Sequence, residues 1–265
     1  MTDKCAWFIN LSDDEHAAQA AARQLKPYGL PIRGQRWPQG LAWLAAAQEA
    51  ASANAAVVLV FGPASRYADP ILRRDLALFR LRLHTQLGRP LNGFTVLGGD
   101  APDPGAAPDA PPPPVHPAVL DDWTPLPAAG WPAKVVARAH APSAPAWPIA
   151  LGLHAHERLG VWLETHPQPG HTAPGALLGV AGHGAKIDFH AVGPKGGLPA
   201  STDNQYELKG VQFTAADTAF EAWALRNAIG PDERYYTRLD GDPDLLAIGT
   251  LPDGEPRDVS LIRLG

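Results

Sequence analysis

The stretch 98–117, GGDAPDPGAAPDAPPPPVHP, divides the sequence into two parts. Proline has no backbone donor and a fixed φ, so a segment this rich in proline can continue neither a helix nor a central strand. We expect residues 99–118 to form an extended, stiff linker between a first domain at 1–98 and a second domain at 119–265. A chain of 265 residues is long enough for two such domains.

Strand-like and helix-like segments alternate along the first part of the chain. Ser12 and Glu15 have the spacing of a capping box at the start of the first helix, and Pro70 suits the first turn of the last one. Strands that alternate with helices predict a parallel sheet with helices on both faces, an α/β fold. The expected strands are 6–11, 30–34, 55–62 and 91–98, and the expected helices are 12–26, 41–53 and 70–87.

The second part has a different pattern and is predicted to be an α+β domain with a mainly antiparallel sheet. Residues 148–167 read as two short strands around a turn, and 217–231 as one helix that ends at a Gly-Pro pair. Asp240-Gly241 and Asp253-Gly254 then separate three strand-like runs, as turns in a meander would. The glycine-rich runs 177–189 and 193–199 do not have phosphate-loop spacing, so we interpret them as tight turns.

Charge and cysteine content limit the classes of function. The formal net charge is -5, but the first 98 residues hold eleven Lys and Arg against seven Asp and Glu. A moderately basic half suits a small anionic molecule or an acidic partner surface, and it is too weakly basic to favour nucleic acid. The single cysteine, Cys5, excludes an internal disulfide, and no apolar run is long enough to span a membrane. We therefore expect a cytoplasmic protein.

The carboxyl ends of the predicted parallel strands should meet at one edge, where open α/β sheets bind their ligands. Asn10 and Ser12 follow the first strand, and the loop GLPIRGQRWPQGLAWL at 29–44 includes the short second strand and continues beyond it. This loop holds Arg33, Arg36 and Trp37, which suit a phosphate and a nucleotide base. Ser65 and Tyr67 follow the third strand. Trp37 could equally pack back under the helix at 41–53.

The same segments carry a resemblance to a known family. FINLSDDE, the loop at 29–44 and VVLVFGPASRYADPILRRDL resemble the successive elements of a bacterial Toll/interleukin-1 receptor (TIR) domain, over a little more than a third of the chain. The resemblance implies a flavodoxin-like fold and an effector that hydrolyses NAD+, used in antiphage defence and activated by self-association. NAD+ would then be a substrate rather than a cofactor, and the loop at 29–44 would flank its pocket and dock a neighbouring subunit. The second domain would serve as the sensor or assembly part and could bind a protein partner.

One departure from the family pattern concerns the catalytic acid. NAD-cleaving TIR domains place a glutamate in the helix after the third strand, in a pattern like Ser-x-x-Cys-x-x-Glu-Leu. The matching run here is DPILRRDL, which puts Asp75 at that position with a side chain shorter by one methylene. Asp75 could instead only favour the dipole of its helix. The alternative function is therefore a catalytically inactive TIR-like scaffold that docks protein partners.

The histidines of the second part suggest a further alternative. His154 and His156 would share one face of a strand, which is a usable geometry for metal ligands. No second spaced pair completes a site, so we predict no metal.

Overall fold

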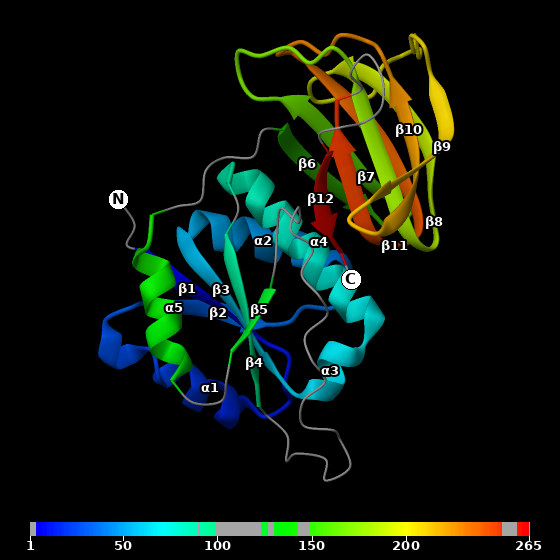
Figure 1. The fold of residues 1–265 in the computed structure, drawn as a ribbon. Coiled ribbons are helices and arrows are strands. Elements are labelled where there is room, and N and C mark those ends of the chain that lie inside the picture. Colours follow the sequence, from blue (N-terminus) through cyan, green and yellow to red (C-terminus); the bar gives the residue numbers. More distant parts are fainter. Residues whose placement is uncertain are drawn as a thin grey trace. The chain divides into compact units, whose positions relative to one another are not determined.

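The computed structural model describes residues 4–89, 91–98, 123–126, 130–142, 149–250 and 259–264. These residues form two compact units, the first up to residue 142 and the second from residue 149 (Figure 1). The predicted linker at 99–118 lies outside the described residues. None of the described helices is long and apolar enough to cross a membrane.

The first unit is built on a parallel sheet of five strands in the order β2-β1-β3-β4-β5. The central strand β3 is buried along its whole length, as its continuous apolar run predicts for a strand covered on both faces. The α/β class predicted for this part is thus confirmed. The strands are β1 Cys5–Asn10, β2 Ile32–Arg36, β3 Ala55–Gly62, β4 Asn92–Leu97 and β5 Trp123–Leu126.

The first unit extends beyond residue 98, the predicted end of the first domain. Strand β5 pairs with β4, from Gly93↔Trp123 to Val96↔Leu126, and helix α5 (Trp131–His140) contacts β3. The proline-rich segment therefore leads back into the same sheet. The boundary at 119 is wrong because proline content marks where regular structure stops, and it does not show which sheet the next strand joins.

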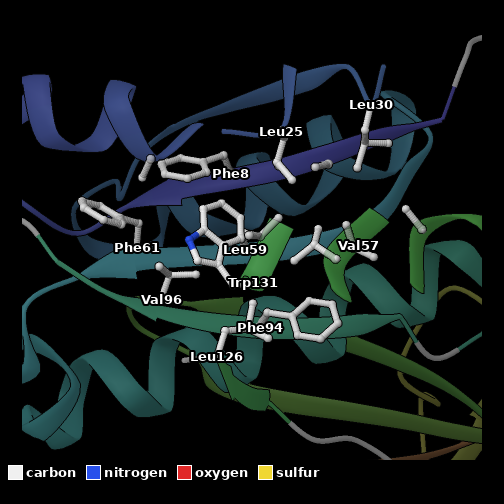
Figure 2. Close-up of a cluster of buried hydrophobic side chains, with 14 of the residues drawn as sticks. Phe8, Leu25, Leu30, Val57, Leu59, Phe61, Phe94, Val96, Leu126 and Trp131 are labelled. Carbon is white, nitrogen blue, oxygen red and sulfur yellow. The ribbon is translucent and has the colours of Figure 1, made fainter. Parts of the chain in front are cut away.

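Helices cover both faces of this sheet. One face packs against α1 and α5, and the core between them is drawn in Figure 2. Trp131 of α5 is buried there with Phe8, Leu59 and Val96 from three strands. Helix α2 contacts β3 and packs against α4. The helices are α1 Glu15–Arg23, α2 Trp43–Ser52, α3 Ala64–Ala68, α4 Pro70–Leu87 and α5, with 3-10 turns at Lys26–Tyr28 and Gly40–Ala42.

The N-cap of helix α1 lies two residues later than the predicted one, Ser12. This N-cap is Asp14, whose carboxylate accepts a hydrogen bond from the amide of Ala17. The hydroxyl of Ser12 instead accepts from the amide of Asp14, in a turn that precedes the helix. The predicted capping box between Ser12 and Glu15 is therefore not formed, because two residues in this acidic run can cap and the later one does so.

The predicted loop at 29–44 is mostly regular structure. Strand β2 runs to Arg36, so both arginines lie on the strand, and only Trp37–Gln39 separate it from the next 3-10 turn. Gly34 permits the extension, because its φ is +153° and a Cβ at this position would overlap the backbone of Phe8 on β1. A glycine often indicates a loop, but Gly34 marks the close approach of strands β1 and β2.

The second unit is a seven-stranded sheet in which every pairing is antiparallel, in the order β6-β7-β11-β8-β10-β9 with β12 beside β11. The predicted antiparallel sheet is confirmed. Two long strands, β8 and β11, pair with each other along most of their length. The strands are β6 Ile149–His156, β7 Gly160–Pro167, β8 Ala176–Pro194, β9 Leu208–Ala215, β10 Thr218–Leu225, β11 Glu233–Gly249 and β12 Val259–Arg263.

Three predictions for the second unit are wrong. The expected helix at 217–231 is strand β10, and the described part of this unit contains no helix, so it is not α+β. Asp240-Gly241 is not a hairpin turn, because β11 continues through it with a shift in register against β8. The glycine-rich run 177–189 lies within β8, whereas 193–199 does contain a turn. Asp253-Gly254 lies outside the described residues.

Candidate functional site

The carboxyl ends of the parallel strands form the candidate site. Asn10 ends β1 and is the register partner of Arg36 at the end of β2 and of Phe61 near the end of β3. Phe61 in turn pairs with Val96 of β4. The last residues of four strands therefore lie along one edge, where the turns that follow them can gather around a ligand.

Asn10 and Ser12 shape the turn at this edge. The side-chain oxygen of Asn10 accepts from the amide of Ser12 at 2.9 Å, and its backbone oxygen accepts from the amide of Trp37 at 2.8 Å. Both side chains are buried. Their hydrogen bonds hold the start of α1 and the end of β2 together, so these residues position the edge and expose little of themselves to a ligand.

Arg36 lies at the edge, whereas Arg33 does not. Arg36 forms an ion pair with Asp13, and both side chains are largely exposed. Exposed pairs contribute about 0–1 kcal/mol, so an anionic ligand could take the place of Asp13 at little cost. Arg33 pairs in register with Trp7 toward the amino end of β1, and its charge opposes the rise that burial produces in the pKa of Cys5.

Trp37 and Asp75 both lie beside one aromatic side chain of α4. The ring of Trp37 meets the buried ring of Phe79 edge to face, with 5.8 Å between centroids. Asp75 lies one turn before Phe79, and residues four apart share a helix face. We infer that Asp75 is on the side of α4 that Trp37 contacts. Trp37 does pack back onto a helix, and the ring contact that it makes there is with α4.

Asp75 is only partly exposed, and its surroundings raise the pKa of its carboxyl. Burial raises its pKa, the nearby Arg74 lowers it, and Asp69 raises it further. Asp69 is the N-cap of α4, with its carboxylate accepting from the amides of Ile71 and Leu72. The net direction is upward, which is the usual behaviour of a carboxyl held away from water.

Tyr67 and Ser65 lie on α3, after β3. The hydroxyl of Tyr67 lies 2.7 Å from the backbone oxygen of Val60 and 3.3 Å from that of Val96, so it joins the ends of β3 and β4. Burial raises the pKa of this hydroxyl far above its usual value. Ser65 is exposed. Tyr67 therefore supports the edge, and Ser65 is accessible beside it.

Two cavities lined by described residues lie away from this edge. One, of about 540 Å³, lies between the end of α1 and the start of β2 and includes Arg23, Lys26 and Leu30 in its lining. The other, of about 400 Å³, belongs to the second unit. The candidate site is therefore defined by its side chains and by the sheet edge.

The second unit contains a polar cluster around the buried His190 that the sequence did not reveal. The ring of His190 on β8 lies 2.9 Å from the hydroxyl of Tyr235 through Nδ1 and 2.7 Å from a carboxylate oxygen of Glu207 through Nε2. Glu207 also binds Lys209 at 2.9 Å and Asn204 at 2.8 Å. The residues are distant in sequence, and only the pairing of β8 with β11 brings His190 to Tyr235.

His154 and His156 do not form a metal site with each other. His154 is 3.0 Å from a carboxylate oxygen of Glu164 on the neighbouring strand, and His156 accepts from the amide of Arg158. Among the described residues, no group of three or more His, Cys, Asp or Glu side chains is placed to hold a metal ion.

No family model, no curated protein and no solved structure matches the chain.

Proposed function

We propose that the first unit is a flavodoxin-like, TIR-like domain of a cytoplasmic effector that splits NAD+ at the bond between nicotinamide and ribose. The observation that carries the proposal is the position of Asp75, a partly buried carboxyl on α4, the second helix after β3. It lies one turn from the residue on which Trp37 packs. The strand order 2-1-3-4-5, which is that of flavodoxin-like sheets, supports the choice of fold.

Asp75, Arg36 and Trp37 have proposed roles in this reaction. The ribose becomes cationic as nicotinamide leaves, and a fixed carboxylate at Asp75 stabilises that charge most strongly where water is excluded. Arg36 binds the pyrophosphate by exchanging the carboxylate of Asp13 for a phosphate oxygen. Trp37 offers an aromatic surface to a base. Self-association of the chain activates the domain, and defence against phage is the role that the resemblance implies.

A second candidate function is an inactive scaffold that only docks partners. It is favoured by the engagement of Asn10 and Ser12, whose side-chain oxygens both accept hydrogen bonds from backbone amides. A site whose polar groups serve its own turns has less to offer a substrate. In this case the edge would be an interaction surface, and Asp75 would only contribute to α4.

The test that separates the two candidate functions measures, by chromatography, whether the purified full chain releases nicotinamide from NAD+. Asp75→Asn keeps the volume but removes the charge, so we expect activity to fall by about a hundredfold or more, on the scale of losing one electrostatic group. Asp75→Glu should retain or raise activity, because it restores the longer reach of the family's acid. The matched control is Glu49→Gln, an exposed carboxylate on α2 that should change nothing.

If the wild type and Asp75→Glu are both inert, even at concentrations at which the chain self-associates, only the scaffold function remains. Activity that survives Asp75→Asn would place the reacting carboxylate elsewhere. If the wild type is inert and Asp75→Glu is active, the protein is an enzyme that lost its activity because the side chain of its acid is one methylene too short.

A further inference from the structure

Strand β2 is the last strand on one side of the parallel sheet. Its neighbour is β1, and no other strand of the described chain pairs with it. We call the side that faces away from β1 the outer side of β2. The strand contains no proline, and its pairing with β1 has no shift in register. Two common devices that prevent a terminal strand from pairing with another chain are therefore missing here.

The outer side of β2 presents both a backbone donor and a backbone acceptor. The oxygen of Pro31 accepts from β1 at 2.9 Å, and the amide of Trp37 donates to β1 at 2.8 Å. The C=O and N–H of one trans peptide unit point in opposite directions, and the described chain contains no cis peptide. The amide of Ile32 and the oxygen of Arg36 therefore point away from β1, as the free groups of an unpaired strand do.

A cavity lies beside the start of this strand. It has a volume of about 540 Å³, and Ile32 lines it together with the end of α1 and the segment that leads into β2. Ala22, Leu30 and Ile32 give it an apolar wall. Where a peptide adds a strand to a sheet, main-chain hydrogen bonds hold it and pockets beside the sheet accept its alternate side chains. The cavity is placed to be such a pocket.

Positive charge lies around both the cavity and the strand. Arg23 and Lys26 line the cavity, and its lining contains no Asp or Glu. Arg33 follows Ile32 on β2, so its side chain leaves the opposite face of the strand. All three cations are exposed, and none forms an ion pair with a residue that the structure describes. The Nε of Arg23 donates to the backbone oxygen of Gln19 at 3.2 Å.

These charges and the backbone together select the kind of partner. The arginines of β2 would repel the same strand of a second copy, so the outer side favours an acidic chain. A phosphate backbone accepts hydrogen bonds but donates none, so it would leave the oxygen of Arg36 without a partner. An extended peptide supplies a donor and an acceptor from its own main chain. An acidic peptide therefore meets every feature of this surface.

We propose that an extended acidic segment of a partner protein docks along the outer side of β2 as an additional strand. Its main chain accepts from the amide of Ile32 and donates to the oxygen of Arg36. One glutamate enters the cavity, where its methylenes pack against Leu30 and its carboxylate meets Lys26. The acidic residue next to it leaves the other face and meets Arg33. This docking does not depend on NAD+ cleavage.

The test compares two synthetic peptides, acetyl-Thr-Val-Glu-Glu-Val-Thr-amide and the same peptide with Gln-Gln in place of Glu-Glu. Each is titrated into the full chain and followed by amide NMR. We expect the acidic peptide to bind about fivefold more tightly, the scale of two exposed ion pairs, and salt at about 0.5 M should reduce the difference. The amide of Ile32 should shift and exchange more slowly, whereas that of Trp37, which already donates to β1, should change little.

Variants assign the preference to the proposed cations. Lys26→Gln and Arg33→Gln should each lower the preference for the acidic peptide about twofold and leave binding of the Gln-Gln peptide unchanged. Both side chains are exposed, so neither substitution removes a buried contact. The matched control is Lys134→Gln, an exposed cation on α5 outside the cavity lining, which should change nothing.

Four results would overturn the proposal. They are no binding of the acidic peptide, equal binding of the two peptides, a preference that survives both Lys26→Gln and Arg33→Gln, and binding that leaves the amide of Ile32 unchanged. The last result would mean that charge alone attracts the peptide and that no strand is added. A shift of the Ile32 amide with protein concentration, without peptide, would instead assign the outer side of β2 to a second copy of the chain.

Discussion

The hydroxyl of Tyr67 can be removed without changing the shape of the side chain, by the substitution Tyr67→Phe. This hydroxyl lies at the edge proposed to bind NAD+, 2.7 Å from the backbone oxygen of Val60 on β3 and 3.3 Å from that of Val96 on β4. The hydroxyl has one proton and donates it mainly to the nearer oxygen, that of Val60. The substitution therefore removes a side-chain link between the ends of these two strands.

The expected loss follows from these contacts. A typical hydrogen bond contributes about 0.5–1.5 kcal/mol net, and the loss is larger when a buried partner is left unsatisfied. The ring of Phe keeps the apolar contacts of Tyr67, so the hydroxyl accounts for nearly all of the change. We expect the free energy of unfolding to fall by about 1–2 kcal/mol and Tm by about 3–6 °C for a unit of this size.

Scanning calorimetry of the full chain measures this loss, and hydrogen exchange locates it. The amide of Gly98 donates to Gly62 and that of Leu11 donates to Phe61, so both report on the strand ends that Tyr67 joins. Their exchange should become faster than that of amides in the middle of β3. Tyr28→Phe is the control, because Tyr28 is 49 % exposed and its hydroxyl forms no hydrogen bond with the residues that the structure describes. Equal effects of the two substitutions would refute the reasoning.

Two further predictions concern the core and the response to acid. Trp131→Ala should destabilise the first unit by about 3–5 kcal/mol, as loss of a buried Trp does, while antiparallel-sheet amides such as those of β8 keep their protection from exchange. Loss of protection in β8 alone would show that α5 does not belong to the first unit. Burial lowers the pKa of His190, and Glu207 opposes this effect. Below about pH 6.5 the imidazole of His190 therefore binds a proton more readily in the unfolded chain than in the folded chain. Stability should therefore decrease as pH falls below about 6.5, and His190→Gln should make that decrease shallower in urea unfolding curves, whereas His183→Gln should not.

The first sheet could be predicted from sequence because its strands are continuous apolar runs. AAVVLVFG at 55–62 is strand β3 to the residue, since a strand buried on both faces shows no polar interruption. Asn10 and Tyr67 were expected at the carboxyl edge and do lie there, because parallel strands bring their ends to one side. Strand β5 could not be found in this way, since only four residues of it lie behind a long proline-rich segment.

The second unit was harder to predict because propensity and environment disagree there. The segment TAFEAWAL is rich in good helix formers, but Phe220, Ala222 and Ala224 are buried and alternate with more exposed neighbours, which is the period of a strand. Gly241 looked like a turn and is an irregularity in β11, at φ +73° with its Cβ position occupied by the backbone of Gly184. One sequence pattern serves both turn and bulge, and only the partner strand distinguishes them. The buried pair of His190 and Tyr235 has no local signal at all.

The late arrival of β5 and α5 has a consequence for synthesis of the chain. Four strands of the parallel sheet are complete once residue 97 has been made, but the last strand and the helix that seals the core end at residue 140. At about 5–20 residues per second, a ribosome needs roughly 2 to 9 s to cover that interval. Throughout it, the face that carries Phe94 and Val96 is covered by α1 but not yet by α5. The number of residues between 97 and 140 thus fixes how long this core of the nascent domain stays incomplete and exposed to chaperones and to aggregation.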